Sequence, residues 1–144
     1  MKRSLLVEAD GGPLGAVVAG ANVPDFKLLA ATLDAIVVPR PEPTARRPQH
    51  LCLDKGYDND TSWGEALERD YEPHIALIHD SRPPNRPRHK PRRWVVERTL
   101  GWLSKCRAIL IRYDKKAANY LGLIQLACAL LWYRRHHRLV EAAF

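Results

Sequence analysis

The sequence predicts a single α/β domain in which helices flank a mixed sheet, and three observations lead to this fold class. The length of 144 residues fits one domain. A composition of 46% hydrophobic and 27% charged residues is typical of a globular protein and excludes wholesale disorder. Short apolar runs and segments of helical periodicity follow one another in the order β-β-α-β-α-β-α-α, which is typical of a layered α/β domain.

The N-terminal segment predicts a β-hairpin followed by a helix. Residues 4–9 and 14–21 are apolar runs separated by Asp10-Gly11-Gly12-Pro13, and turn residues between two such runs are typical of a hairpin. Asp25 then stands where it can cap a helix that runs to about residue 34.

The middle of the chain predicts two strands, a helix and a basic loop. Residues 50–53 form a short apolar run that ends in Asp54-Lys55-Gly56-Tyr57-Asp58. A helix capped by Thr61 or Ser62 is expected to about residue 69, and a strand at residues 73–78. Residues 81–93 hold six Lys/Arg, four prolines and no acidic residue. Because proline disrupts helix interiors and central strands, this segment is expected to be an extended loop within the domain.

Two helices are expected in the C-terminal third. From Trp94 the apolar residues follow a helical stripe, with Glu97 in the first turn at its edge. The stripe consists of Val96, Leu100, Leu103, Cys106 and Leu110. A second helix is expected over residues 117–136. Its most apolar part, residues 121–133, falls short of the roughly 20 residues of a membrane span and is expected to be a buried core helix.

The charge is uneven along the chain, although the total is +7. Residues 51–80 carry a net charge of −6, and residues 81–144 carry +12. One interpretation is two solvated faces of opposite sign; the other is an acidic site for cations beside a surface for phosphates. Three cysteines without metal-like or disulfide-like spacing favour buried thiols in a cytosolic protein.

Two carboxylates are candidates for metal ligands. Asp54 follows an apolar strand directly, so a rigid element would hold its side chain at the edge of the sheet. The alternative is an aspartate that only forms a turn before Gly56. Glu97 lies among tryptophans and arginines in the first turn of its helix, where an acid also stabilises the helix dipole. Each residue alone favours the structural role.

Two passages of the chain resemble the C-terminal part of bacterial insertion-sequence transposases. They read LCLDKGYD at residues 51–58 and RRWVVERTLGWLSKCRAILIRYDKKAANYLGLIQLACALLWYRR at residues 92–135. The second passage is very specific, and the hairpin, its following helix and the basic loop also fit. The chain therefore resembles, over essentially its whole length, the DDE-type enzymes of the insertion-sequence-five group, which have a ribonuclease-H-like catalytic fold.

The resemblance implies a catalytic site and its chemistry. The second catalytic aspartate of the family falls on Asp54 and the catalytic glutamate on Glu97. Enzymes of this family bind two divalent cations, Mg²⁺ or Mn²⁺, between their carboxylates. The implied reactions are hydrolysis of DNA at the transposon ends and attack of the freed 3′ hydroxyl on target DNA.

The resemblance also implies that part of this catalytic domain is absent from residues 1–144. The family's first aspartate lies on a strand upstream of residues 4–9, and Asp25 and Asp58 are expected to be a helix cap and a turn residue rather than substitutes for it. The chain is thus expected to be a truncated transposase or a second reading frame that works with the upstream product, with a homodimer on DNA as a further partner. The alternatives are a non-catalytic basic DNA-binding fragment and a decayed remnant.

The basic residues around Glu97 are expected to contact DNA phosphates, which position DNA without reading its sequence. Trp94 and Trp102 are expected in the core, with stacking on an unpaired base as the alternative. Residues 134–138 are expected to complement the dipole of the last helix. The expected location is the bacterial cytoplasm, at the nucleoid. The predicted DNA-binding residues are Arg82, Arg86, Arg88, Lys90, Arg92, Arg93, Arg98, Lys105, Arg107 and Arg112.

Overall fold

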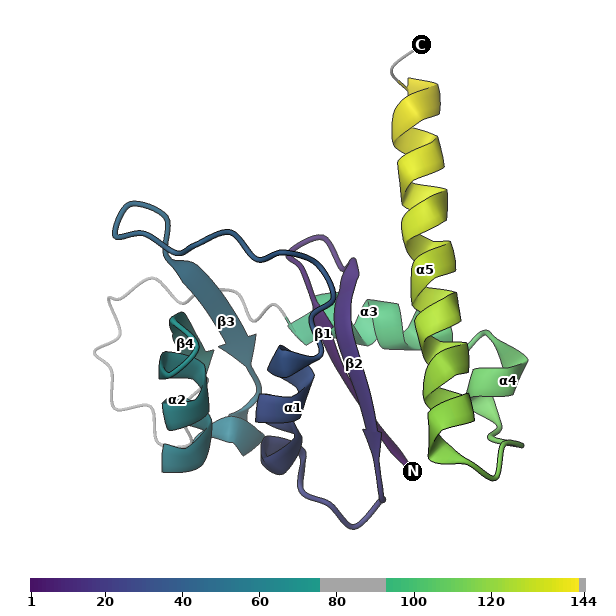
Figure 1. Cartoon of the computed structure of the whole chain (residues 1–144), viewed down its shortest axis with the longest axis horizontal. Helices are drawn as coiled ribbons and strands as arrows, with labels where there is room; N and C mark the ends of the chain where they lie inside the picture. The colour runs from purple at the N-terminus through teal and green to yellow at the C-terminus, as the bar shows by residue number, and fades with distance from the viewer. Residues whose placement is uncertain (76–92, 143–144) are drawn as a thin grey trace.

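The computed structural model shown in Figure 1 describes residues 1–75 and 93–142. The described part is a mixed α/β structure, as predicted, and its order of elements agrees with the expected one apart from an added short helix, α4. The expected basic loop at 81–93 lies outside the described residues except for Arg93, which begins a helix. The elements are β1 (Lys2–Val7), β2 (Pro13–Ala19), the 3-10 helix η1 (Asp25–Leu28), α1 (Leu29–Asp34), β3 (Gln49–Leu53), the 3-10 helix η2 (Lys55–Tyr57), α2 (Asp60–Leu67), β4 (Tyr71–Ile75), α3 (Arg93–Leu103), α4 (Arg107–Leu110) and α5 (Ala117–Ala142).

The predicted hairpin is confirmed. Strands β1 and β2 pair antiparallel, with Lys2 opposite Ala19 and a register shift between Leu6 and Val7. The turn requires Gly11, whose φ of 88° lies in the left-handed region that other residues rarely adopt.

The hairpin lies between two helical layers. On one face, the Ser4 hydroxyl of β1 and the Thr32 hydroxyl of α1 share a hydrogen bond of 2.7 Å, which Ser4 donates because Thr32 donates to the Leu28 carbonyl oxygen. On the other face, Leu5, Ala16 and Val18 pack against a buried cluster supplied by α3, α4 and α5. That cluster consists of Leu103, Ile109, Tyr120, Ile124 and Ala127. Because side chains alternate along each strand, one set faces α1 and the other set faces the cluster supplied by α3, α4 and α5.

Strands β3 and β4 form a second, parallel pair, which α2 connects and covers. Leu51 of β3 is 4% exposed and packs with Leu29, Leu33 and Ala66. Leu6 of β1 packs against the same cluster, so α1 lies against both strand pairs. The prediction of one mixed sheet is not met in the described part, which holds two separate two-stranded sheets. The two sheets are separate because no described strand hydrogen-bonds both to the β1–β2 pair and to the β3–β4 pair.

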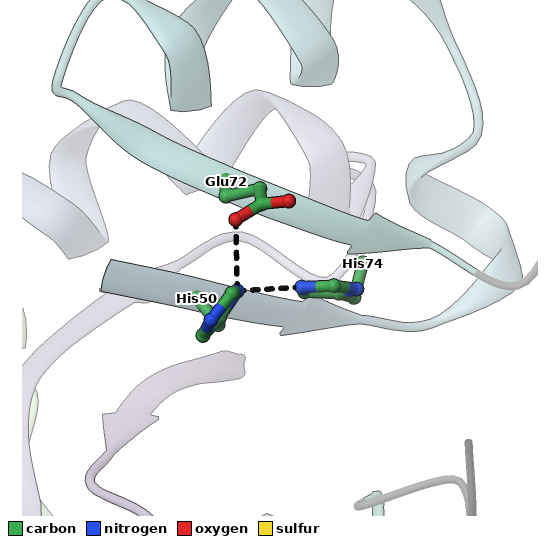
Figure 2. Close-up of side chains that lie close together, drawn as sticks. All are labelled: His50, Glu72 and His74. Carbon is green, nitrogen blue, oxygen red and sulfur yellow. Dashed lines mark hydrogen bonds and ion pairs between the residues drawn. The ribbon is translucent and has the colours of Figure 1, made fainter. Parts of the chain in front are cut away.

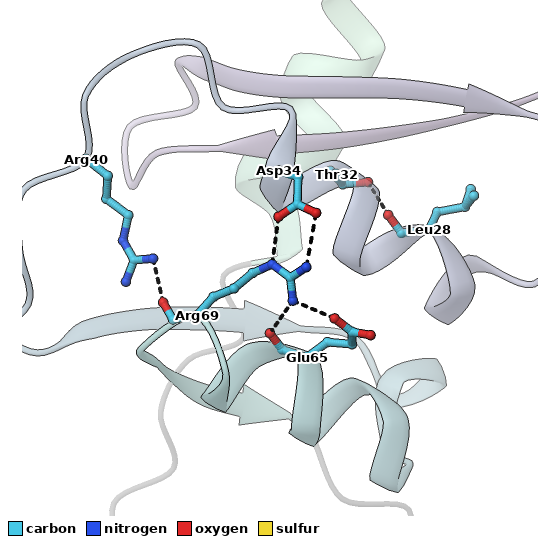
Figure 3. A network of polar contacts seen from close by, with 6 residues as sticks. All are labelled: Leu28, Thr32, Asp34, Arg40, Glu65 and Arg69. Carbon is cyan, nitrogen blue, oxygen red and sulfur yellow. Dashed lines mark hydrogen bonds and ion pairs between the residues drawn. The ribbon is translucent and has the colours of Figure 1, made fainter.

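An arginine joins the two helices that cover β3. Figure 3 shows the Arg69 guanidinium between Asp34 at the end of α1 and Glu65 of α2. Its Nε and Nη2 donate to the two carboxylate oxygens of Asp34 at 2.8 and 3.0 Å. Arg40 adds a hydrogen bond to the carbonyl oxygen of Arg69. A bidentate pair of this kind fixes orientation as well as distance.

Two predicted helix caps are wrong. Helix α2 is capped by Asn59, whose side-chain oxygen accepts from the backbone N–H of Ser62 at 3.0 Å, so neither Thr61 nor Ser62 is the cap. Asp25 lies inside η1 and forms an ion pair with Lys2 at 3.1 Å instead of capping the helix. In both cases the chain enters the helix one to three residues before the expected position.

The stripe predicted from Trp94 onward does not form one helix. Helix α3 ends at Leu103, and a turn precedes the four-residue helix α4. The buried residues of α3 are Val95, Thr99 and Leu103, a face shifted by one residue from the predicted stripe. In α4, Ile109 is 2% exposed and Leu110 is 61% exposed, which reverses the prediction for Leu110.

Helix α5 is longer and less buried than predicted. It has 26 residues, and its C-terminal part extends beyond the rest of the molecule (Figure 1). Tyr120, Ile124 and Ala127 are buried, whereas Leu126 is 68% exposed, so one face rather than the whole segment enters the core. Among the described residues, no helix combines the length and apolarity that crossing a membrane requires.

Candidate metal and DNA-binding site

Asp54 lies where the sequence predicted it, in an exposed position directly after β3. It is also the cap of η2, because its Oδ1 accepts from the backbone N–H of Lys55 at 2.8 Å. The structural role that the sequence allowed is thus present. The cap is one hydrogen bond to a carboxylate, and an ionised carboxylate can accept about four.

Two carboxylates, Asp25 and Asp54, act electrostatically on Tyr57. Burial of the Tyr57 phenol raises its pKa, and the negative charges of Asp25 and Asp54 raise the pKa further. Asp25 is reached through the packing of η1 against η2. The structure therefore brings together Asp25, Asp54 and Tyr57, with Asp25 partly neutralised by Lys2. The sequence did not predict this group, because η1 and η2 lie far apart along the chain.

Glu97 lies on an exposed position of α3. The two residues that follow it, Arg98 and Thr99, hold that helix to the hairpin turn. The Thr99 hydroxyl, in a side chain that is 3% exposed, donates to the Gly11 carbonyl oxygen at 2.7 Å. Arg98 donates to the Asp10 carbonyl oxygen. A Cβ on Gly11 would stand 2.8 Å from Arg98 Nη2 and 3.0 Å from Thr99 Oγ1, so this close approach also requires glycine.

The structure does not gather Asp54 and Glu97 into a metal cluster within the described residues. The described clusters of three or more His, Cys, Asp or Glu side chains include neither of them. Their chemistry nevertheless fits a hard cation, since both offer carboxylate oxygens from exposed positions on fixed elements.

The predicted DNA-binding residues fall into three groups. Arg82, Arg86, Arg88, Lys90 and Arg92 lie outside the described residues, as does the side chain of Arg93. Arg98, Lys105 and Arg107 are exposed. Arg112 is half-buried, with its guanidinium 5.8 Å from the centre of the Tyr120 ring and donating to the Lys115 carbonyl oxygen.

A basic hollow between α3 and α5 is a feature that sequence reasoning missed. It has a volume of about 360 Å³, and four arginines and Trp102 are among the residues that line it. The arginines are Arg98, Arg134, Arg135 and Arg138. The sequence interpretation assigned the last three to the helix dipole. Their helical spacing places them on one side of α5, but only the fold brings Arg98 opposite them.

The two tryptophans of α3 differ in their surroundings. Trp94 is 57% exposed, so its predicted place in the core is wrong, and the Arg98 guanidinium lies 5.0 Å from its ring centre. Trp102 is half-buried at the wall of the hollow, with the Arg134 guanidinium 5.9 Å from its ring centre. Trp94 is exposed because the buried face of α3 follows Val95, Thr99 and Leu103.

The comparison with known protein families identifies the class of protein. A model of the transposase DDE domain matches residues 1–132, a segment that includes Asp54, Glu97 and the hairpin turn. The chain belongs to the transposase DDE domain family. It is 33% identical over 132 residues to a putative transposase for insertion sequence element IS402 of Burkholderia cepacia. That alignment covers 90% of this chain and 61% of the relative, so the chain spans about three-fifths of the relative's length. No solved structure matches the chain.

This family assignment confirms the predicted resemblance to the DDE-type insertion-sequence transposases. It also supports the expectation of a divalent metal and of DNA as partner at the level of the family. The insertion-sequence-five group and the identity of the metal stay predictions.

Proposed function

We propose that this chain supplies Asp54 and Glu97 to the catalytic centre of a metal-dependent transposase, which cleaves DNA at transposon ends and joins the freed 3′ hydroxyl to target DNA. The observation that carries the proposal is the match of the DDE domain over residues 1–132, which contains both acids. The exposure of both side chains on fixed elements supports it.

The proposed fold is the ribonuclease-H-like arrangement of the insertion-sequence-five group, with residues 1–144 as one partial catalytic domain. Its support is the shared packing of both strand pairs on α1, through Leu6 and Leu51. One additional strand between β1 and β3 would join the two pairs into a mixed sheet. We expect that strand, with the first catalytic aspartate, to come from outside these residues, in keeping with the 61% coverage of the relative.

The ions in this proposal are two Mg²⁺ or Mn²⁺, held by Asp54 and Glu97 together with the first aspartate. Such ions, when bound, would stabilise the negative charge on the attacking and leaving oxygens. The chain's own contribution is to fix the acids. The β3 strand and the η2 cap hold Asp54, and the anchoring of α3 to the hairpin turn holds the helix of Glu97.

The basic residues are proposed to bind the DNA backbone. The hollow lined by Arg98, Arg134, Arg135 and Arg138 presents several guanidinium groups to one region of space, and guanidinium pairs with phosphate in bidentate geometry. Trp94 offers an exposed ring beside Arg98 for stacking on an unpaired base. Binding of this kind weakens steeply as salt rises. A protein that acts on DNA is expected at the bacterial nucleoid.

A second candidate function is a non-catalytic DNA-binding fragment. It is favoured by the basic hollow, which needs neither acid. The two functions differ in their partner: the catalytic one requires the upstream reading-frame product or a second copy of the chain to complete the site.

The test is strand cleavage by the purified chain together with the upstream product, measured as nicking of supercoiled plasmid in Mn²⁺. Glu97→Gln removes one metal-binding oxygen while keeping the shape of the side chain, and it is expected to abolish nicking and leave DNA affinity nearly unchanged. Glu68→Gln, an exposed glutamate at the end of α2, is the matched control and is expected to nick as the unmodified chain does.

The outcomes separate the two candidates. Nicking that survives Glu97→Gln would refute the assignment of Glu97. Salt-sensitive DNA binding without nicking by the unmodified proteins would favour the non-catalytic fragment.

A further inference from the structure

The face of the β3–β4 pair that points away from α1 and α2 carries a group of metal-binding side chains. In the parallel register, His50 lies opposite Glu72, and Cys52 lies opposite His74. Because side chains alternate along a strand, these four residues share one face, while Leu51 and Pro73 turn to the buried side. The group lies on two hydrogen-bonded strands, so its backbone positions are fixed.

Three of these side chains converge on one atom. Figure 2 shows His50 Nδ1 between Glu72 and His74. The distance from His50 Nδ1 to His74 Nε2 is 2.7 Å, and to Glu72 Oε2 it is 3.2 Å. The ligand atoms of the three residues lie within 4.8 Å of one another. His50 and Glu72 are exposed and His74 is half-buried, so an ion from solvent can reach the group.

We propose that His50, Glu72 and His74 form a binding site for a divalent transition-metal ion of the Zn²⁺ class. An ion of this class binds imidazole nitrogen and carboxylate oxygen at about 2.0–2.2 Å, so its tetrahedral ligands stand about 3.3 Å apart. The contacts of 2.7 and 3.2 Å lie close to this spacing. Placing an ion among the three ligand atoms requires the His50–His74 contact to open slightly, and Glu72 and His74, whose ligand atoms lie within 4.8 Å, to draw together by side-chain rotation.

The donor set decides the class of metal. Two imidazoles and one carboxylate suit Zn²⁺, Co²⁺ or Ni²⁺, whereas Mg²⁺ prefers a shell of oxygen ligands. This site is therefore distinct in chemistry from the carboxylate site proposed at Asp54 and Glu97, and its argument does not rest on that proposal. Three protein ligands leave a position for water.

The bound ion would clamp β3 to β4. His50 comes from β3, and Glu72 and His74 come from β4. The ion therefore adds a cross-link to the five residue pairs by which the two strands already associate. Strand β3 leads directly into Asp54, and a clamp on this pair would fix the strand that carries that acid. A ligand that binds only the folded state raises its stability with the logarithm of ligand concentration, once that concentration exceeds the Kd.

The experiment is a calorimetric titration of the tag-free, reduced chain with Zn²⁺, and separately with Mg²⁺, together with thermal unfolding in each ion. We expect one Zn²⁺ per chain at this site and a rise in Tm with Zn²⁺, with no rise at equal Mg²⁺ concentration. His50→Gln and Glu72→Gln should each weaken Zn²⁺ binding about tenfold or more, since even outer-shell changes at metal sites cost that much.

The matched control is His137→Gln on α5. His137 is also exposed and also lies beside a carboxylate, with Nδ1 at 3.3 Å from Glu141 Oε2, but it has one carboxylate partner and no second imidazole in the described contacts. We expect this variant to bind Zn²⁺ as the unmodified chain does. Circular dichroism of the metal-free variants checks that each is folded.

Three results would overturn the proposal: no Zn²⁺ binding by the unmodified chain, equal binding after His50→Gln in a folded variant, or equal loss of binding after His137→Gln. In any of these cases the contacts in Figure 2 would be a hydrogen-bonded group only.

Discussion

Replacing Thr99 by Val tests the contact that holds α3, and with it Glu97, to the hairpin. The Thr99 hydroxyl lies 2.7 Å from the Gly11 carbonyl oxygen and 3.3 Å from the Val95 carbonyl oxygen. A hydroxyl has one hydrogen, and the shorter distance assigns it to Gly11. Valine keeps the shape and removes the donor, leaving a carbonyl on the buried Gly11 without it.

The size of the effect follows from burial. Depriving a buried acceptor of its donor costs about 1–3 kcal/mol. The methyl group that replaces the hydroxyl regains up to about 0.8 kcal/mol through burial, since Thr99 is 3% exposed. The net loss in the free energy of unfolding therefore lies between about 0.2 and 3 kcal/mol, and we expect a central value of about 1–2 kcal/mol. For a chain of this length the corresponding fall in Tm is about 2–8 °C.

Urea unfolding followed by tryptophan fluorescence measures this change, because Trp94 and Trp102 flank the substitution on α3. Thr61→Val is the matched control: Thr61 is exposed in the first turn of α2, and its replacement is expected to change stability by no more than about 0.5 kcal/mol. The reasoning is refuted if Thr99→Val is as stable as Thr61→Val.

Two further predictions concern titratable groups. Burial raises the pKa of the Cys128 thiol to about 11, so at about pH 8 little thiolate is present and Cys128 should react slowly with thiol reagents. Cys52 is exposed, so its predicted burial is wrong; it should react first, and Cys52→Ser should remove that fast phase. The hydrogen bonds and charge of Arg69 hold the pKa of Asp34 below its usual value. Stability from this pair is therefore complete above roughly pH 4 and fades as pH falls further, so Asp34→Asn should flatten the acid limb of urea midpoints measured between roughly pH 6 and pH 3.

Local sequence signals predicted the elements that depend on local structure. The Asp10-Gly11-Gly12-Pro13 turn between apolar runs gave a hairpin because the positive φ of Gly11 is a property of the turn itself. The strand before Asp54 was also predicted from local signals, because a short apolar run ends there in turn residues. The same signals placed Asp54 at the end of that strand. The match of the transposase family rests on longer motifs and agrees with the resemblance found at residues 92–135.

The rest depends on contacts between distant segments. The apolar stripe from Val96 to Leu110 continues in phase across a turn, so periodicity alone gave one helix. In the structure the Ser104 hydroxyl donates to the Leu100 carbonyl oxygen, and Arg3 of β1 donates to Ser104 where α3 ends. Strand β1 supplies this contact, so the sequence of α3 alone does not predict where the helix ends. The approach of Asp25 to Tyr57 and of Arg98 to α5 is of the same kind.

The hairpin turn connects the proposed acid and the proposed phosphate-binding arginines. Gly11 contacts α3, as described, and Gly12 contacts α5, because a Cβ there would stand 2.4 Å from Trp132. Glu8 accepts from the Gly12 backbone N–H at 3.1 Å and from Arg135 at 2.9 Å, which ties the same turn to the basic hollow. A displacement of this turn would therefore move Glu97 and the arginines of α5 together. In this arrangement the position of the proposed metal-binding acid relative to the proposed phosphate-binding arginines depends on two adjacent glycines, because no larger side chain fits between both helices.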